Sequence, residues 1–242
     1  MSISLAVENL TVRYGASVAV SGVSFTVEAG SITSLVGSNG AGKTSILRAI
    51  SGIVPAGGGN VTFDGRSLLS RPSEHRAALG LAHVLEGRHV FPGMTVVENL
   101  RLGAYCRKDR LENRMIEEVE ELFPRLAERR NQLAGSLSGG EQQMLAIGRA
   151  LMISPKLMLM DEPTMGLSPQ MIDIIVDGLD RLRRQGLTLL LVEQNAVEAI
   201  QMSEKVYALR LGEIIDEGRG DAFDVDRLTS IYLDIDTGGR VR

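Results

Sequence analysis

The sequence predicts an α/β fold with a mainly parallel sheet and an inserted helical subdomain. Strand-like segments alternate with helical ones in the first and last thirds of the chain, and a glycine-rich loop joins a strand to a helix near the N-terminus. Between Pro92 and Pro155 the pattern is helical. Alternating strands and helices are typical of a parallel sheet covered on both faces. We expect one domain over 1–242, with a core over 1–90 and 155–233, a helical subdomain over 91–154 and a flexible tail over 234–242.

The core segments that precede the helical subdomain are rich in Val, Ile and Thr. Gly15 and Gly30 mark turns between strands, and the cluster Pro55–Gly59 is expected to break the chain. The predicted elements are strands at Leu5–Thr11, Val18–Val27 and Ile32–Val36, a helix at Ser45–Ser51 and a strand at Asn60–Phe63.

The helical subdomain contains an amphipathic segment with apolar residues on one face and acidic residues mostly on the other. We interpret the acidic run as the solvated side of a helix and assign it no function. The apolar face comprises Met115, Val119, Leu122, Phe123 and Leu126, and the acidic residues are Glu117, Glu118, Glu120 and Glu121.

Strand character returns after the helical subdomain. Short apolar runs predict buried strands, a helix with one apolar face lies between two of them, and a hairpin is expected to turn at Leu211–Gly212. The strands are predicted at Leu157–Met160, Leu187–Val192 and Val206–Leu209, and the helix face comprises Ile172, Ile175, Val176, Leu179 and Leu182.

Composition excludes several classes of protein. The longest apolar runs are far shorter than the roughly 20 residues that span a bilayer, and Met1–Asn9 lacks the features of a secretory signal. We therefore expect a cytoplasmic chain that reaches membranes only through partners. The single cysteine, Cys106, cannot form an intramolecular disulfide, and the three histidines do not suggest a metal cluster. A net charge of −4 argues against nucleic acid as a partner.

Residues Gly37–Thr44, with the sequence GSNGAGKT, match the phosphate-binding pattern G-x-x-x-x-G-K-[ST]. The segment lies between a predicted strand and a predicted helix, as this motif requires. Its glycines allow backbone N–H groups to point at phosphate oxygens, and the helix contributes its positive end. Lys43 is expected to neutralise the terminal phosphates, and Thr44 to bind Mg²⁺.

Two carboxylates, Asp161 and Glu162, follow the apolar strand Leu157–Met160. A carboxylate at the end of a buried strand needs a cation, hydrogen bonds or a proton. We expect Asp161 to lie on the Mg²⁺ side and Glu162 to polarise an attacking water.

The segment Leu137–Gln142, LSGGEQ, precedes a helix predicted at Gln143–Ile153. Ser138 can cap that helix, and the glycine backbone can meet an anion at its N-terminus. Because the chain already has one phosphate-binding loop, a second anion site suggests a contribution to another subunit's nucleotide. We therefore expect a dimer.

The order of these motifs resembles that of the ATP-binding subunits of ABC transporters, from about Leu5 to Gly218. The resemblance implies a P-loop NTPase core with an N-terminal antiparallel β subdomain, ATP and Mg²⁺ as ligands, and two subunits stacked head to tail around two ATP molecules. It also implies that the loop Met165–Pro169 touches the other subunit. The implied ATP-contacting residues are Tyr14 beside adenine, Gly37, Ser38, Asn39, Gly40, Ala41, Gly42, Lys43, Thr44, Ser45 and Asp161, with Ser138, Gly139, Gly140 and Gln142 acting on the partner's ATP.

Two positions depart from the family pattern. Glu86 stands where the family usually has a glutamine that senses Mg²⁺ and the attacking water, and Gln194 replaces the histidine that contacts the γ-phosphate. We expect Glu86 to meet the cation. Glutamine donates a hydrogen bond but carries no positive charge and relays no proton as imidazole does, so we expect ATP to bind well and turn over slowly.

The segments Glu86–Pro92 and Val192–Asn195 resemble one branch of the family, the second ATPase of high-affinity branched-chain amino-acid importers. The resemblance implies a non-identical second ATPase, two permeases and an extracytoplasmic solute-binding protein as partners. The apolar residues Val90, Phe91 and Met94 would suit a docking groove for a permease helix, and core packing is the alternative. An ATPase of a lipid or polysaccharide exporter and a soluble ABC ATPase acting on DNA or ribosomes remain alternatives. A small-molecule kinase does not explain the LSGGE segment.

Overall fold

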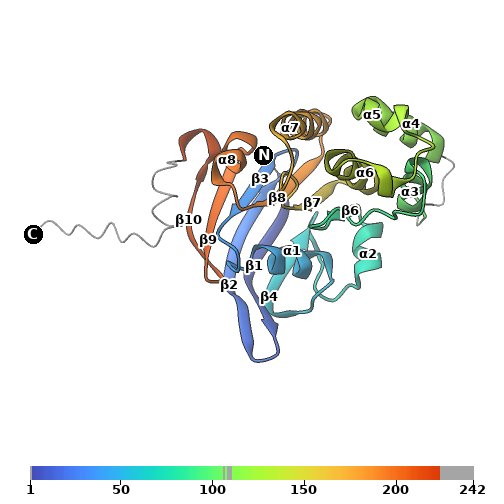
Figure 1. Ribbon diagram of the computed structural model, residues 1–242. Coiled ribbons are helices and arrows are strands. Elements are labelled where there is room, and N and C mark those ends of the chain that lie inside the picture. Colours follow the sequence, from blue (N-terminus) through green and yellow to red (C-terminus); the bar gives the residue numbers. More distant parts are fainter. Residues whose placement is uncertain (1, 106, 108–110, 224–242) are drawn as a thin grey trace, which may run out of the picture.

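A computed structural model describes residues 2–105, 107 and 111–223, which form an α/β fold with two β-sheets (Figure 1). One sheet has four strands in the order β2-β1-β4-β5, and the other has six in the order β10-β9-β3-β8-β7-β6. Cys106 and the tail 234–242 lie outside the described residues. The predicted fold class is confirmed, including the antiparallel β subdomain.

The four-stranded sheet is antiparallel throughout and is formed mainly by the N-terminal part of the chain. Strand alternation places one face of the sheet against the core, so that Leu5, Val7 and Val12 are almost completely buried. Its strands are β1 (Ile3–Tyr14), β2 (Ser17–Glu28), β4 (Ala56–Phe63) and β5 (Arg66–Ser67).

The six-stranded sheet is parallel except for β10 at its edge, which pairs antiparallel with β9 through the predicted turn at Leu211–Gly212. Every residue of β3, β7 and β8 is buried, as expected for parallel strands covered on both faces. The carboxyl ends of these strands therefore meet along one edge of the sheet. The strands are β3 (Ile32–Val36), β6 (Leu81–Val84), β7 (Leu157–Asp161), β8 (Thr188–Glu193), β9 (Lys205–Arg210) and β10 (Glu213–Arg219).

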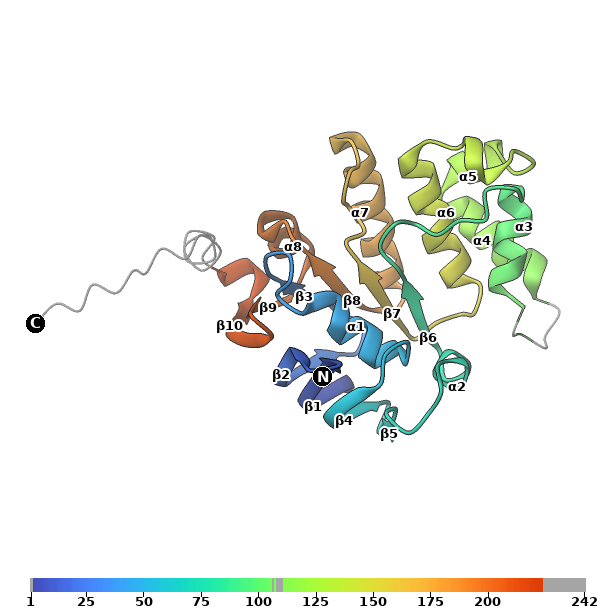
Figure 2. The same cartoon turned by 60° about the horizontal axis from the view of Figure 1, so that its bottom comes forward.

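Helix α1 (Lys43–Ser51) contacts strands of both sheets, and Figure 2 shows it in front of the central strands. Ile46, Leu47 and Ile50 on this helix are fully buried. They belong to one apolar cluster with residues of both sheets. The helix that follows the glycine-rich loop is therefore fixed on both sides, which gives the loop a rigid base.

The helices of the middle region gather on one side of the molecule (Figure 1). All five residues of the predicted apolar face are at most 9% exposed, which confirms their burial. They do not lie on one helix, because one helix ends at Leu122 and a second begins at Pro124. Within the described residues, no helix combines the length and the apolar character needed to cross a membrane. The helices are α2 (Ser73–Ala78), α3 (Val96–Gly103), α4 (Glu112–Leu122), α5 (Pro124–Glu128), η1 (Ala134–Ser136), α6 (Gly139–Leu151), α7 (Pro169–Arg184), α8 (Ala196–Met202) and η2 (Gly220–Ala222).

Two element predictions are wrong in their bounds. The cluster Pro55–Gly59 does not break the chain, because β4 begins at Ala56 and pairs with β1 through register shifts that accommodate the glycines. The helix predicted at Gln143–Ile153 begins earlier, at Gly139, because Ser138 caps it there. The second correction matters for function, since it places both signature glycines in the first turn of a helix.

Candidate functional site

The glycine-rich loop connects β3 to α1 and has a backbone that only small residues permit. Gly40 and Gly42 have φ angles of 83° and 103°, in the left-handed region that favours glycine. A Cβ atom at Gly37 would lie 2.6 Å from the backbone oxygen of Leu209. The first N–H groups of α1 have no partner within the helix, so the loop and the helix start together form an anion-binding site.

Lys43 is 4% exposed and lies under this loop. Its Nζ donates hydrogen bonds to the backbone oxygens of Gly37 at 2.7 Å and Ser38 at 3.2 Å, and it lies 3.7 Å from Glu162 Oε1. Burial lowers the pKa of Lys43, while the nearby charges of Glu162 and Asp161 oppose that shift. The ammonium group of Lys43 is thus held in place by the glycine-rich loop.

Thr44 and Asp161 are brought together from sequence positions 117 residues apart. The hydroxyl of Thr44 donates a hydrogen bond to Asp161 Oδ1 at 3.0 Å, whereas the buried Oδ2 has no partner. Burial raises the pKa of Asp161 to about 6; the hydrogen bond from Thr44 opposes this shift, and the charges of Glu86 and Glu162 add to it. An unpartnered buried carboxylate oxygen beside a hydroxyl suits a small divalent cation.

Glu162 follows β7 in a left-handed backbone conformation, with φ of 48°. Such a conformation costs about 1–3 kcal/mol for a residue with a side chain, and it persists where the surroundings hold it. Its backbone N–H donates to the oxygen of Val192 at 2.9 Å, which ties the loop after β7 to the end of β8. The side chain faces Lys43.

Glu193 is a buried acid beside this site that sequence reasoning did not identify. It is 2% exposed, and Thr164, from the loop after Glu162, contacts its carboxylate through both its backbone N–H and its hydroxyl. The signal for it was present, because Glu193 ends the apolar run Leu187–Val192 as Asp161 ends Leu157–Met160. The same reasoning about carboxylates at strand ends applies to both residues.

The remaining predicted residues lie at the edge of this centre. Gln194 is exposed and lines a cavity of about 460 Å³ together with Glu162 and Glu193. Glu86 is also exposed, near enough for its charge to affect Asp161. Tyr14 is 43% exposed at the end of β1. Within the described chain, no three His, Cys, Asp or Glu side chains are grouped to hold a metal ion.

The signature segment forms the start of α6, and no hydrogen bond or ion pair of the described residues joins it to the glycine-rich loop. Ser138 caps the helix and forms a capping box with Glu141, confirming the expected cap. A Cβ at Gly139 would lie 2.7 Å from the guanidinium of Arg88. The sequence did not single out Arg88, whose side chain packs here.

Comparison with known proteins now identifies the family. The ABC transporter family matches residues 20–165 of this chain, which include the glycine-rich loop, the signature and both carboxylates. This chain belongs to the ABC transporter family. The predicted family and the prediction of an ATPase are therefore confirmed. In this ABC ATPase, Gly37–Thr44 correspond to the P-loop of the family and Leu137–Gln142 to its signature.

Individual members of the family cover nearly all of this ABC ATPase. The high-affinity branched-chain amino acid transport ATP-binding protein BraG of Pseudomonas aeruginosa is 44% identical over 90% of this chain and 94% of its own. The lipopolysaccharide export system ATP-binding protein LptB of Haemophilus influenzae is 34% identical over 95% of this chain and 96% of its own. The crystal structure of a nucleotide-free ATP-binding cassette from an ABC transporter superposes with a TM-score of 0.84 at 27% identity, covering 96% of each chain.

Proposed function

We propose that this ABC ATPase energises the import of branched-chain amino acids or related small polar solutes. The observation that carries this proposal is the 44% identity with BraG over nine-tenths of the chain. The match to LptB keeps the exporter alternative open, but its identity of 34% is lower over a similar length. The sequence Glu193-Gln-Asn in place of a switch histidine also favours the importer branch.

The P-loop holds the phosphates of ATP through the backbone N–H groups of Ser38–Ser45 and the ammonium of Lys43. In the ligand-free protein Lys43 faces Glu162 at 3.7 Å, so the arriving phosphate competes with Glu162 for the same cation. Binding of ATP thereby releases Glu162 for its own role. Tyr14, exposed at the end of β1, stacks on the adenine ring.

The residues that would hold Mg²⁺ are Thr44 and Asp161, with Glu86 at the edge of the site. The fit rests on the unpartnered Asp161 Oδ2 beside the Thr44 hydroxyl. Phosphate oxygens and water would supply the ligands that these side chains do not. When bound, the ion neutralises charge on the terminal phosphates of ATP.

Glu162 acts as the general base and takes a proton from the water that attacks the γ-phosphorus. Its left-handed backbone and the hydrogen bond to Val192 aim the carboxylate along the carboxyl edge of the sheet. Gln194 lines the same cavity and donates a hydrogen bond to the γ-phosphate. Because Gln194 holds no positive charge, this site turns over slowly.

Ser138, Gly139, Gly140 and Gln142 serve the ATP of a second, non-identical ATPase. In support, the N-terminus of α6 has a capped, glycine-lined first turn that can receive a phosphate, and it shares no hydrogen bond with the chain's own P-loop in the described residues. Met165, in the loop expected to touch that second subunit, is 50% exposed.

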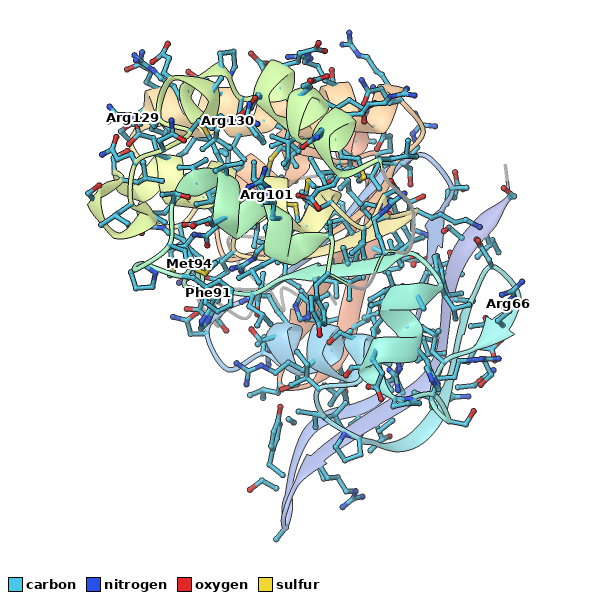
Figure 3. All side chains as sticks on the ribbon, turned by 90° about the vertical axis from the view of Figure 1, so that its right-hand side faces the viewer. Arg66, Phe91, Met94, Arg101, Arg129 and Arg130 are labelled. Carbon is cyan, nitrogen blue, oxygen red and sulfur yellow. The ribbon has the colours of Figure 1, made fainter. Side chains whose placement is uncertain are left out.

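A groove between the segment after β6 and helices α3 and α6 receives a cytoplasmic helix of the permease. The groove has a volume of about 470 Å³, and Phe91, at its wall, is 48% exposed. Figure 3 shows Phe91 and Met94 together on one turn, whose backbone hydrogen bond measures 3.1 Å. Arg149 also lines the groove, stacks on Phe91 and has a buried Nη1 without a partner, so an acceptor on the incoming helix would satisfy it.

Under this proposal the chain works at the cytoplasmic face of the membrane, held there by two permeases and supplied with solute by an extracytoplasmic binding protein. The test is to purify the chain together with candidate permeases and a candidate second ATPase, and to measure ATP hydrolysis with a leucine-loaded binding protein. We expect the loaded protein to stimulate hydrolysis. Absence of co-purification and of stimulation would exclude the importer, and stimulation by lipopolysaccharide would favour the exporter.

A further inference from the structure

Three polar side chains form a short chain behind Glu162. The hydroxyl Oγ1 of Thr164 lies 2.9 Å from Glu193 Oε1 and 2.7 Å from Glu198 Oε2. Glu193 is 2% exposed and Thr164 4% exposed, whereas Glu198, on α8, is only partly buried. The chain therefore runs from a buried acid at the end of β8 to an acid near solvent.

Two carboxylates and one hydroxyl have a single hydrogen to share. The two short contacts need two hydrogens, so one further proton is required. A hydroxyl donates a single hydrogen, so Thr164 can donate to Glu193 or to Glu198 but not to both. The other short oxygen–oxygen contact is then favourable only if that carboxyl is protonated and donates to Thr164. The hydrogen-bond geometry thus implies that one of the two carboxyl groups, that of Glu193 or that of Glu198, is protonated.

The charges around Glu193 agree with a bound proton. Burial raises the pKa of Glu193 to about 7; the hydrogen bonds from Thr164 oppose this shift, and the charges of Glu198 and Glu162 add to it. The cation that faces these acids is Lys43, which is already engaged by the P-loop and Glu162. At neutral pH, a second full negative charge in the chain is therefore unfavourable.

The hydrogen-bonded chain Glu193–Thr164–Glu198 also holds the loop that carries the general base, Glu162. The backbone N–H of Thr164 donates to Glu193 Oε1 at 3.3 Å, and the N–H of Glu162 donates to Val192 at 2.9 Å. The end of β8 thus binds the loop after β7 through two hydrogen bonds. Glu162 needs this support because its left-handed backbone is costly.

We propose that Glu193 is a positioning residue of the hydrolytic site, and that it holds Glu162 in place only while the Glu193–Thr164–Glu198 chain retains its proton. This rests on the role of Glu162 under the proposed function. When the proton leaves through Thr164 and Glu198 to water, both carboxylates are charged, one hydroxyl contact becomes repulsive, and the loop loosens. ATP hydrolysis then slows with rising pH, although ATP binding at the P-loop remains.

The first test compares Glu193→Gln with Glu193→Ala in the full chain, assembled with its partner subunits. Glutamine is the neutral analogue of the protonated acid: with its NH2 at the position of Oε1 it donates to the Thr164 hydroxyl, which then donates to Glu198, and only the longer 3.3 Å contact from the Thr164 N–H is lost. We expect Glu193→Gln to keep kcat within about threefold of the original value at neutral pH, and Glu193→Ala to lower it by about tenfold or more. Thermal unfolding and ATP affinity, measured alongside, show whether the variants are folded.

The decisive readout is the dependence of kcat on pH between about pH 6 and about pH 9. In the unmodified protein kcat falls above about pH 7, by up to about tenfold per pH unit, as the proton is lost. In Glu193→Gln this decline is absent, whereas the exposed-acid control Glu213→Gln retains it. A Glu193→Gln variant that declines like the original protein, or that is as slow as Glu193→Ala at neutral pH, overturns the proposal.

An infrared difference spectrum separates this proposal from the function on which it rests. When the spectrum of ligand-free Glu193→Gln is subtracted from that of the unmodified protein near neutral pH, the carbonyl stretch of one protonated carboxylic acid is expected to remain, because any contribution of Asp161 is common to both spectra. If the assembled protein hydrolyses no ATP, the proposed function fails, and the spectrum still decides whether the proton is present. A spectrum without that band overturns the proton-holding chain.

Discussion

At the residue scale, the hydrolytic site places the buried cation Lys43 among several acids. Lys43 is buried with Glu162 at 3.7 Å, and the charges of Asp161 and Glu193 also act on it. In the ligand-free state these acids are only partly neutralised. Burial raises the pKa values of Asp161 and Glu193, and the charges of the neighbouring acids add to that shift. A bound phosphate and its metal ion would change the balance between the positive charge of Lys43 and the negative charges of the acids.

The assignment of Glu162 as general base predicts a selective loss of turnover. Glu162→Gln preserves size and hydrogen bonding but accepts no proton, so we expect kcat to fall by about 10²–10⁴ while ATP still binds. Nucleotide affinity and single-turnover hydrolysis measure the two properties separately. Lys43→Ala is the contrasting control, because it removes the phosphate contact and should abolish binding. Normal hydrolysis by Glu162→Gln would show that another group is the base.

The pKa of Asp161 predicts how the stability of the ligand-free protein changes with pH. Because folding raises this pKa from 3.8 to about 6, the stability that the protonated acid contributes is present below about pH 4 and is lost as pH rises through about 6. At pH 8, Asp161→Asn should raise the free energy of unfolding by up to about 3 kcal/mol, because the amide carries no buried charge.

Thermal unfolding without nucleotide at several pH values measures this gain, which should shrink as pH falls toward about 4. Asp177→Asn, at an exposed position on α7, is the control and should change little. Addition of Mg²⁺ and ATP should stabilise the original protein more than Asp161→Asn, because the asparagine offers no charge to the ion. Equal stability of the two ligand-free proteins at pH 8 would contradict the buried charge.

Residues that lie in contiguous motifs could be predicted from the sequence as candidates for this site. The P-loop, Asp161 and Glu162 lie in contiguous motifs, and the structure brings Lys43, Thr44 and these two acids together. The partners of Glu193 were not predictable in this way, because Thr164 and Glu193 are 29 residues apart and meet only when β7 and β8 pair. Long-range contacts of this kind depend on strand order.

At the element scale, the groove and the signature both depend on how closely α3 and α6 approach. Gly103 ends α3, and a Cβ atom there would meet the backbone oxygen of Arg149 and lie 2.9 Å from Cβ of Met152. Arg149 lines the groove, and α6 begins at the signature. One glycine contact thus helps to set the position of both functional surfaces.

Gly103→Ala should therefore force α3 and α6 apart. We expect the free energy of unfolding to fall by about 1–3 kcal/mol, as for other overpacked sites. Chemical denaturation measures this change. Gly93→Ala is the matched control, because a Cβ there meets nothing within 4 Å and should change stability by no more than about 0.5 kcal/mol. Equal effects of the two substitutions would show that the helices tolerate the added methyl group.

The helices and strands were largely predictable, because the spacing of apolar residues along the sequence and the positions of glycines indicate them. The predicted strands, α1 and the hairpin at Leu211–Gly212 follow the expected order, whereas β5 and β6 were not predicted. The two errors have local causes. Glycines that usually end a strand are accommodated in β4 by register shifts, and α6 starts at Gly139 because a capping box outweighs the low helix propensity of two glycines.

At the scale of the whole molecule, the P-loop and the signature are parts of different sites. In the described residues, the side chain of Ser138 bonds with Glu141 in its capping box, whereas Lys43 is engaged by the P-loop and Glu162. Sequence order alone places them 95 residues apart and does not say which nucleotide each serves. If the signature acts on a partner's ATP, damage to it should appear in the partner's turnover.

A pair of double variants tests this expectation in the assembled transporter. Lys43→Ala silences the chain's own P-loop, so the hydrolysis that remains occurs at the partner's P-loop. Adding Ser138→Arg should lower that remaining rate by about 10²-fold, the scale of one lost transition-state donor, because a bulky side chain replaces the hydroxyl at the phosphate. Adding Ser136→Arg instead, at an exposed position outside α6, should leave the rate unchanged. Single-turnover hydrolysis measures both rates, and an equal rate in the two double variants would mean that the signature does not act on the partner's nucleotide.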